Sequence, residues 1–193
     1  LVGNLPVIDD PAIAHDLSAM LDDVVAAAMM KKCPLACGGS LWCEQTHVMW
    51  SIDIDGNGVS DLDRLCDEAA VEIPRQIRLR GMSGPVLIDV PRLPIEQARR
   101  FRARLQNVLD EDPRQPEYLG VTRGGLLELS VPHGEMALDV VMQDQPAQAA
   151  LAGLRLAMRR PSLHAVTLVV SREMADWLQG PGKPARDQLN KPL

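Results

Sequence analysis

The sequence predicts an α/β (α+β) fold, a mixed sheet with flanking helices. The first observation is a pair of short apolar, β-branched strands, at 51–56 and 85–90, that each carry an acidic residue near their end. The second is the segment between them, whose apolar residues recur at helical spacing. A helix that joins two strands in this way is typical of parallel neighbours. The third is a set of alternating segments that indicate hairpins, which add antiparallel strands.

The first predicted helix covers residues 11–31. Asp10 is a typical N-cap, and Pro11 suits the first helical position. Apolar residues recur along this segment at the spacing of one helix face. They are Ile13, Leu17, Met20, Leu21, Val24, Val25 and Ala28. We therefore expect residues 1–32 to be an N-terminal helical segment with one apolar side.

A hairpin is predicted to follow this helix. Residues 33–39 are expected to form a loop, and 40–44 pair with 47–55 as two antiparallel strands. The turn between them is expected near Gln45 and Thr46. Side chains along the second strand alternate between its two faces, so its apolar and acidic residues separate.

The next predicted elements are a helix, a strand and a second helix. Ser60 is expected to cap the first helix, and Pro74 to kink it. Its buried stripe consists of Leu62, Leu65, Ala69, Ile73 and Ile77. The strand at 85–90 is a continuous apolar run, which is typical of burial on both faces. In the helix at 94–110, the inward-facing residues are expected to be Ile95, Ala98, Phe101, Leu105 and Val108.

The last part of the chain is predicted to contain a second hairpin and a small subdomain. The hairpin pairs 117–122 with 126–131. A small α-β-α subdomain is expected after a polar linker. Its elements are a helix at 147–160, a strand at 165–171 and a helix at 172–178 capped by Ser171. The predicted domains are thus 1–32, 33–131, the linker 132–146, and 147–193.

Composition excludes several classes of protein. No apolar run approaches the roughly 18 residues of a membrane helix, so no membrane span is expected. Four cysteines without dense, regular spacing favour reduced thiols in the cytoplasm. The net charge of −6 argues against a generally basic nucleic-acid binder. Because the chain starts with Leu1 and stops at Leu193 without a natural finish, we expect a piece of a longer protein.

Charge is distributed unevenly along the chain. Residues 1–71 contain 12 acids and 3 bases, a net charge of −9, whereas 72–104 contain 8 arginines and 3 acids, a net charge of +5. A basic face on an acidic protein would suit a phosphodiester substrate. Arginines that are simply solvated on helix surfaces are the equally weighted alternative.

Acidic residues lie at the ends of the two central strands. Asp53 and Asp89 each follow an apolar run, and Asp55 shares a strand face with Asp53. Since a right-handed crossover aligns the carboxyl ends of parallel strands, the two acids should meet at one edge of the sheet. Carboxylate oxygens are the ligands that a hard divalent cation prefers. Taken singly, each aspartate is better explained as a helix cap or a turn residue. For the pair, placed on two strands around a crossover, the structural and the metal-binding interpretations have equal weight, and both stay open here.

Two other metal sites are possible by pattern. Residues 53–58 fit the first half of a calcium loop, but the twelfth position, which requires a bidentate Glu, is Arg64. The four cysteines are candidate ligands of a zinc site, but their spacing is looser than that of structural zinc sites, and free core thiols are the favoured interpretation. These are Cys33, Cys37, Cys43 and Cys66. The four histidines are scattered and receive no role.

The turn at Arg123-Gly124-Gly125 is a candidate phosphate contact. Small residues let a ligand approach the backbone, and a guanidinium pairs well with phosphate oxygens. An ordinary turn arginine is the alternative for Arg123.

Together these segments resemble the ribonuclease E/G family of bacterial endoribonucleases. The resemblance covers about residues 34–131. It consists of four segments in order: the glycine-rich hairpin entry at 34–42, the strand at 51–55, the string Arg-Gln-Ile-Arg-Leu-Arg with its following acidic strand at 73–89, and the turn and strand at 121–130. The arginine-rich string before an acidic strand is the most specific of these features.

The resemblance implies a DNase I-like catalytic subdomain that cleaves single-stranded RNA with a bound metal ion. It implies that Asp53 and Asp89 hold one Mg²⁺, with Mn²⁺ as a substitute, and that Arg123 contacts RNA. Asp55 stands where the family usually has an Asn that hydrogen-bonds within the metal site. We assign catalytic roles to these three aspartates and expect further RNA contacts from the arginines of the string. Those arginines are Arg75, Arg78 and Arg80.

Departures from the family pattern leave alternatives open. Ser130 is followed by Val131-Pro132-His133 instead of a basic sequence, and neither an S1 domain, a 5′-end sensor nor a cysteine-rich zinc link is recognised. An RNA-binding relative that keeps the fold without turnover is therefore the first alternative. A calcium-binding module at 53–64 is the second. A homo-oligomer formed through other regions is also left open.

Overall fold

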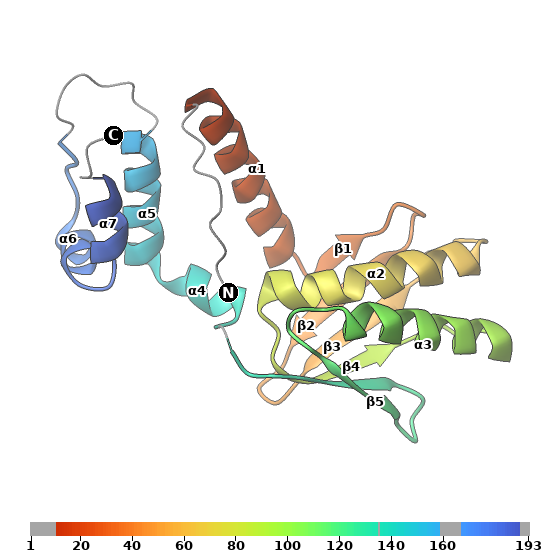
Figure 1. The fold of residues 1–193 in the computed structure, drawn as a ribbon. Coiled ribbons are helices and arrows are strands. Elements are labelled where there is room, and N and C mark those ends of the chain that lie inside the picture. The colour runs from red at the N-terminus through yellow and green to blue at the C-terminus, as the bar shows by residue number, and fades with distance from the viewer. Residues whose placement is uncertain (1–10, 135, 159–166, 190–193) are drawn as a thin grey trace. The chain divides into compact units, whose positions relative to one another are not determined.

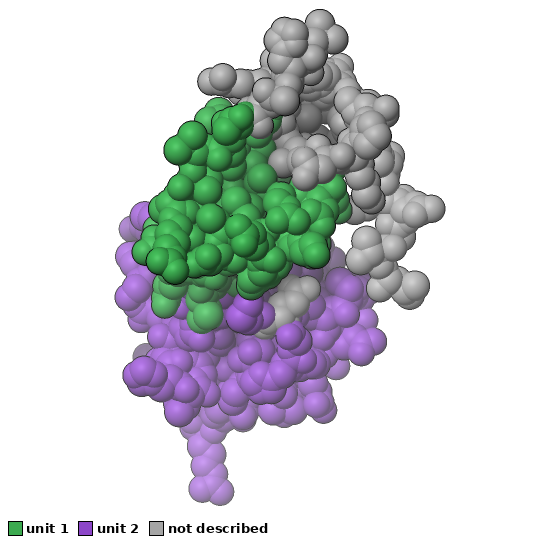
Figure 2. All heavy atoms as spheres, turned by 90° about the vertical axis from the view of Figure 1, so that its left-hand side faces the viewer, with its two compact units in different colours: residues 1–23, 140–193 green, residues 24–139 purple. Residues whose placement is uncertain are grey.

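The computed structural model describes residues 11–134, 136–158 and 167–189 (Figure 1). The chain divides into two compact units. One is formed by residues 24–139, and the other by residues 1–23 together with 140–193, as Figure 2 shows in purple and green. Residues 24–139 contain the whole sheet and every predicted site residue, so this unit is described first.

The sheet has six strands in the order β1-β2-β3-β4-β6-β5. Their bounds are β1 Lys32–Pro34, β2 Ser40–Gln45, β3 Trp50–Asp55, β4 Gly84–Asp89, β5 Glu117–Val121 and β6 Leu127–Val131. β3 and β4 are parallel, and all other neighbours are antiparallel. The predicted mixed sheet is therefore confirmed. The parallel pair lies in its centre, because the crossover helix between β3 and β4 leaves the hairpins to add strands on both sides.

Two helices cover one face of the sheet, α2 (Leu62–Arg80) and α3 (Ile95–Asp110), which lie side by side in Figure 1. Asp61 caps α2, since its side chain accepts a hydrogen bond from the backbone N–H of Arg64. Gly81 ends the helix in a left-handed conformation with φ of 62°. A side chain at Gly81 would also come within 2.8 Å of the carbonyl oxygen of Met136, so glycine is required there.

The core lies between this sheet face and the two helices. Every second residue of the central strands points into it, as the alternation of buried and exposed residues shows. Its fully buried members include Leu41, Ile52, Leu65, Ile73, Ile77, Val86, Ile88, Leu105, Leu109, Leu129 and Val131. The opposite face carries the other half of each strand, including the acidic residues of β3 and β4. We call it the open face, because no helix of residues 24–139 packs on it.

The first hairpin differs from its prediction in register. The turn covers residues 46–49, so Gln45 pairs with Trp50. Thr46 closes this longer turn, because its hydroxyl donates to the carbonyl of Met49 and accepts from two backbone N–H groups. The predicted loop at 33–39 also begins with a strand, because β1 pairs with β2.

Three predictions on burial and capping were wrong. Ser60 does not cap α2, since the N-cap residue is Asp61, one residue later. Ile95 is 84% exposed, because it occupies the first turn of α3 beyond the edge of the core. β4 is not buried on both faces, since Leu87 on the open face is only half-buried. A parallel pair inside a mixed sheet needs helices on one face only.

The other unit is helical in its described part. Two helices each span a boundary between the residue ranges of the two units: α1 (Pro11–Met29) and α4 (Leu138–Gln143). α5 (Gln145–Met158), α6 (Arg172–Gln179) and α7 (Lys183–Leu189) pack around Ala150, Leu154 and Leu178. The helix α4 falls within the segment that we expected to be an irregular linker.

The strand expected at 165–171 is not formed over residues 167–171; residues 165 and 166 lie outside the described residues. The prediction that Ser171 caps the following helix, α6, is confirmed. None of the helices in the described ranges is long and apolar enough to cross a membrane.

Candidate active site

The parallel pairing of β3 and β4 brings the two strand-end aspartates together. Asp53 lies directly opposite Asp89 in the register of the sheet, and both are exposed. Adjacent strands are about 4.8 Å apart, and partners in register point to the same face. The two carboxylates are therefore neighbours on the open face, close enough to share one cation. We call this pair the carboxylate edge.

Among the described residues, no basic side chain pairs with the carboxylate edge. Within the part of the chain that the structure describes, neither Asp53 nor Asp89 makes a hydrogen bond or ion pair with another side chain. Partial burial raises the pKa of Asp53 above its usual range, and the negative charges of Asp89 and Asp55 raise it further. Uncompensated negative charge of this kind favours binding of a cation.

Asp55 lies on the same face, two residues further along β3. One of its carboxylate oxygens, Oδ1, accepts the backbone N–H of Asn57 at 2.8 Å. This contact forms the turn that leads from β3 towards α2, and Asn57 adopts a left-handed conformation with φ of 43°. Asp55 thus has one oxygen engaged in the turn, about 7 Å along the strand from Asp53.

The donor set fits Mg²⁺ better than it fits calcium or zinc. No group of three or more His, Cys, Asp or Glu residues is arranged as a metal cluster in the described ranges. Mg²⁺ typically takes only one or two carboxylates and completes its shell with water and substrate phosphate. The loop at 53–64 is preceded by strand β3 rather than by a helix, and Arg64 pairs with Glu68. It therefore lacks the helix–loop–helix arrangement of an EF-hand.

All four cysteines are free thiols, as predicted. Burial is the main cause that raises the pKa of Cys33 to about 12, and that of Cys43 and Cys66 to about 11. These three thiols stay protonated at neutral pH, so they are poor nucleophiles and poor zinc ligands.

Arg123 lies at the tip of the β5–β6 hairpin and is exposed. It makes no ion pair with any residue in the described ranges, so its guanidinium is free for a ligand. A small cavity of about 120 Å³ opens between this hairpin and the end of β4. It is lined by Val90, Phe101, Arg102, Val121 and Gly125, among others.

The three arginines of the string lie elsewhere. Because α2 runs antiparallel to the strands that it connects, its last turns lie towards the amino ends of β3 and β4. With a rise of about 1.5 Å per residue, Arg75 lies roughly 20 Å along the helix from its start. The arginine string and the carboxylate edge therefore occupy opposite ends of the unit.

Each of these arginines has a protein partner. Arg75 pairs with Glu72 at 2.7 Å, and Arg78 pairs with the fully buried carboxylate of Asp112. Arg80 is 5% exposed and donates to the amide oxygen of Gln76 and to the carbonyl of Met30, both at 2.7 Å. Their role in RNA binding stays a prediction, whereas their structural contacts are shown directly.

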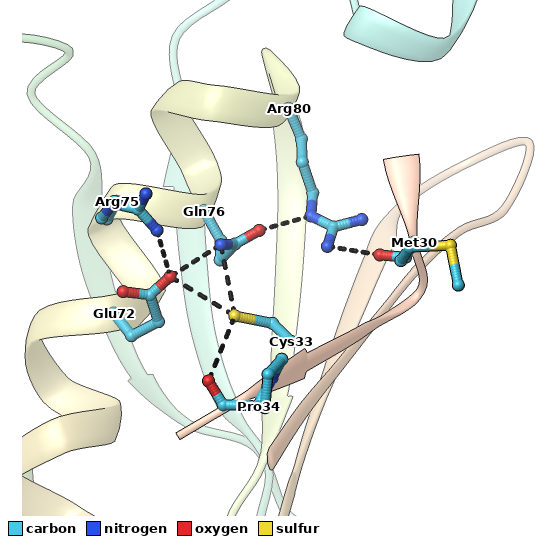
Figure 3. A network of polar contacts seen from close by, with 7 residues as sticks. All are labelled: Met30, Cys33, Pro34, Glu72, Arg75, Gln76 and Arg80. Carbon is cyan, nitrogen blue, oxygen red and sulfur yellow. Dashed lines mark hydrogen bonds and ion pairs between the residues drawn. The ribbon is translucent and has the colours of Figure 1, made fainter. Parts of the chain in front are cut away.

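Figure 3 shows how these contacts join α2 to the start of the sheet. Gln76 also donates to Glu72 at 2.7 Å and to the sulfur of Cys33 at 3.4 Å. The thiol of Cys33 in turn donates to Glu72. We call this set the arginine network; its members are Cys33, Glu72, Arg75, Gln76 and Arg80, with the carbonyl of Met30.

Sequence reasoning missed a neighbour of the carboxylate edge. Trp42 pairs with Asp53 across β2 and β3, on the open face. The predicted turn at Gln45 and Thr46 would have placed Trp42 opposite Met49 instead, far from the acidic residues. A threonine that opens a four-residue turn was the signal that could have given the correct register.

Sequence similarity links the chain to a known protein family. The model of the ribonuclease E/G family matches residues 14–131. Ribonuclease E of Escherichia coli (strain K12) is 29% identical over 118 residues, which are 57% of this chain and 11% of that protein. Ribonuclease G of Haemophilus influenzae is 26% identical over 151 residues, which are 74% of this chain and 29% of that protein.

Ribonuclease G of Escherichia coli is 29% identical over 118 residues, 57% of this chain and 24% of that protein. The chain thus spans less than a third of the length of these three relatives. The family match covers the entire sheet, both of its helices and the carboxylate edge. The chain belongs to the ribonuclease E/G family.

Proposed function

We propose that this chain is the catalytic region of a metal-dependent endoribonuclease that cleaves single-stranded RNA. The observation that carries the proposal is the carboxylate edge, where Asp53 and Asp89 face each other in register and no described residue supplies a counter-charge. Membership of a family named for ribonucleases supports the choice of RNA as substrate.

Asp53 and Asp89 would hold Mg²⁺, or Mn²⁺ in its place. When bound, Mg²⁺ supplies Lewis-acid chemistry: it stabilises charge on a phosphate and lowers the pKa of a coordinated water. The two aspartates would hold that ion on the open face, and Arg123 would neutralise a backbone phosphate. Asp55, through its contact with Asn57, would position the end of β3.

The open face suits a single strand rather than a duplex end or a small molecule. The cavity between the β5–β6 hairpin and the end of β4 is about 120 Å³, which is too small to enclose a nucleotide. An extended strand can instead lie across the exposed row of strand ends, with its phosphates available to cations and its bases available for stacking. The free cysteines are consistent with a reducing compartment such as the cytoplasm.

The second candidate function is RNA binding without turnover. Asp55 favours it, because a carboxylate engaged by Asn57 cannot donate the hydrogen bond that an asparagine amide would provide. Binding by the open face and Arg123 would then persist without cleavage.

Cleavage of a short fluorescent RNA with Mg²⁺ separates the two candidates. We expect Asp89→Asn to reduce the cleavage rate roughly a hundredfold or more, because a bound metal supplies several kcal/mol of stabilisation. Asp110→Asn, on the exposed end of α3, is the matched control and should cleave as wild type does. If wild type and Asp89→Asn are equally inactive while both bind RNA, the enzyme proposal fails and the binding function remains.

A further inference from the structure

A row of side chains crosses four strands at the level of the carboxylate edge. Lys32 pairs with Trp42, Trp42 with Asp53, and Asp53 with Asp89. Partners in register point to the same face of a sheet, so all four side chains lie on the open face. With strands about 4.8 Å apart, Trp42 is one strand and Lys32 two strands, about 10 Å, from Asp53.

Trp42 is an exposed aromatic residue in an otherwise polar setting. It is 38% exposed, whereas Trp50, on the other face of the sheet, is 6% exposed. Its β2 neighbours on this side of the strand are both polar: Ser40, which is buried, and Glu44, which is exposed. The indole is therefore not part of an apolar patch on β2. A large indole beside two carboxylates contributes little to the core, since the core lies on the other side of the sheet.

Lys32 places a positive charge over this ring. Its Nζ lies 5.3 Å from the ring centre of Trp42, a cation–π distance. Lys32 makes no ion pair with any described residue, whereas the adjacent Lys31 pairs with Glu44 at 2.8 Å. Only three basic residues occur in residues 1–71, and Lys32 is the one that lies in this row. The row therefore reads, in order, cation, aromatic ring, carboxylate, carboxylate.

We propose that Trp42 stacks on the base of the nucleotide adjacent to the scissile phosphate, and that Lys32 contacts the next phosphate along the strand. This inference rests on the proposed function, because the carboxylate edge defines where the scissile phosphate lies. Aromatic stacking accepts any base, and a lysine accepts any phosphate. Trp42 and Lys32 thus set the direction of the bound strand without reading its sequence.

Charge balance favours RNA over a protein partner as the occupant. A strand of RNA brings its phosphates to the bound cation and to Lys32, and its bases to the ring between them. A protein surface would have to place opposite charges about 10 Å apart on either side of one aromatic contact. Self-association through this face is the competing outcome that the tests below detect.

Tryptophan fluorescence tests stacking directly. RNA binding is measured with the full chain and Ca²⁺ in place of Mg²⁺, so that a divalent cation stays available to the carboxylate edge. Gel analysis of the RNA after each titration checks that it has not been cleaved. We expect RNA to quench the emission of wild type and of Trp177→Phe, but not of Trp42→Phe, because only Trp42 lies on the open face. Quenching that persists unchanged in Trp42→Phe would overturn the proposal.

Affinity and abasic RNAs locate the stacked base. Trp42→Ala should bind a short RNA about tenfold more weakly, while Trp42→Phe should bind nearly as wild type does. An RNA that lacks one base at a single position should bind wild type about tenfold more weakly than the intact RNA does. Its affinity for Trp42→Ala should be the same as that of the intact RNA, because the stacking partner is already absent. Equal affinity of Trp42→Ala and wild type, or a change in oligomeric state without a change in RNA affinity, would overturn the proposal.

Salt dependence tests Lys32. Each lysine that contacts a phosphate of a single strand contributes about 0.7 to the slope of log K against log salt. Lys32→Ala should lower that slope by about this amount, while Lys31→Ala, whose lysine is already paired with Glu44, should not. Equal slopes for both variants would refute the role of Lys32. Unchanged cleavage by Asp89→Asn would instead refute the carboxylate edge as the cleavage site, and the binding tests would still decide whether Trp42 and Lys32 contact RNA.

Discussion

The two ends of helix α2 use charge in opposite ways. At its start, the carboxylate edge exposes Asp53 and Asp89 without a counter-charge. Near its end, the arginine network gives each of its charged or polar side chains at least one protein partner (Figure 3). Paired groups stabilise the fold, whereas unpaired charges cost stability unless a ligand binds them. The contrast assigns binding to the first end and structural support to the second.

The largest expected effect tests the structural end. Asp112→Ala removes the buried partner of Arg78 and should reduce the free energy of unfolding by about 3 kcal/mol. Asp112 also accepts the backbone N–H of Arg114, so its loss frees a second donor. Urea denaturation measures the change. Asp110→Ala, an exposed carboxylate in the same helix end, should change stability by less than about 0.5 kcal/mol.

Arg80→Met should cost about 2 kcal/mol. The substitution keeps an unbranched side chain in place of the aliphatic stem of Arg80, but leaves the carbonyl of Met30 and the amide oxygen of Gln76 without their donor. Arg75→Met is the matched control; its pair with Glu72 is half-exposed and should contribute less than about 1 kcal/mol. Equal losses for both variants, by thermal or urea unfolding, would mean that burial of Arg80 has no special role.

Mg²⁺ should stabilise the protein only through the carboxylate edge. At ten times the dissociation constant, a ligand of the folded state adds roughly 1.4 kcal/mol. We expect this gain in wild type and in Arg75→Met, but not in Asp89→Asn, when unfolding is followed with and without the metal. If Mg²⁺ also stabilises Asp89→Asn, the metal binds at another site.

The smallest expected effect is a pH-dependent gain in Asp53→Asn. The raised pKa of Asp53 means that the folded state holds this proton more tightly than the unfolded state does. Its ionisation therefore costs stability as pH rises through the folded pKa, and the cost is absent below about pH 3. Without metal, Asp53→Asn should be more stable than wild type by about 0.5 kcal/mol at pH 7, and equal to it near pH 3. A constant difference across this range would contradict the linkage.

The central part of the fold was predictable because local and long-range signals agree there. A crossover is required because a helix lies between two apolar strands in the sequence, with its buried stripe at residues 65, 69, 73 and 77. This crossover aligns Asp53 with Asp89. Both aspartates could thus be placed at one edge from the sequence alone. Their role as metal ligands remains a prediction.

Other features depend on contacts that periodicity does not show. The position of the first hairpin turn is set by hydrogen bonds of Thr46, and with it the register that brings Trp42 next to Asp53. The arginine string looked like a substrate surface, but Arg80 is buried because Gln76 and Met30 satisfy its donors. Charge alone cannot distinguish a paired arginine from a free one.

Diffraction from crystals soaked in Mn²⁺ tests the central claim most directly, because the anomalous signal locates the ion. The account predicts one peak between Asp53 and Asp89, bound directly or through water, and its loss in Asp89→Asn crystals. No peak at this pair, or a peak at another site that persists in Asp89→Asn, would contradict it.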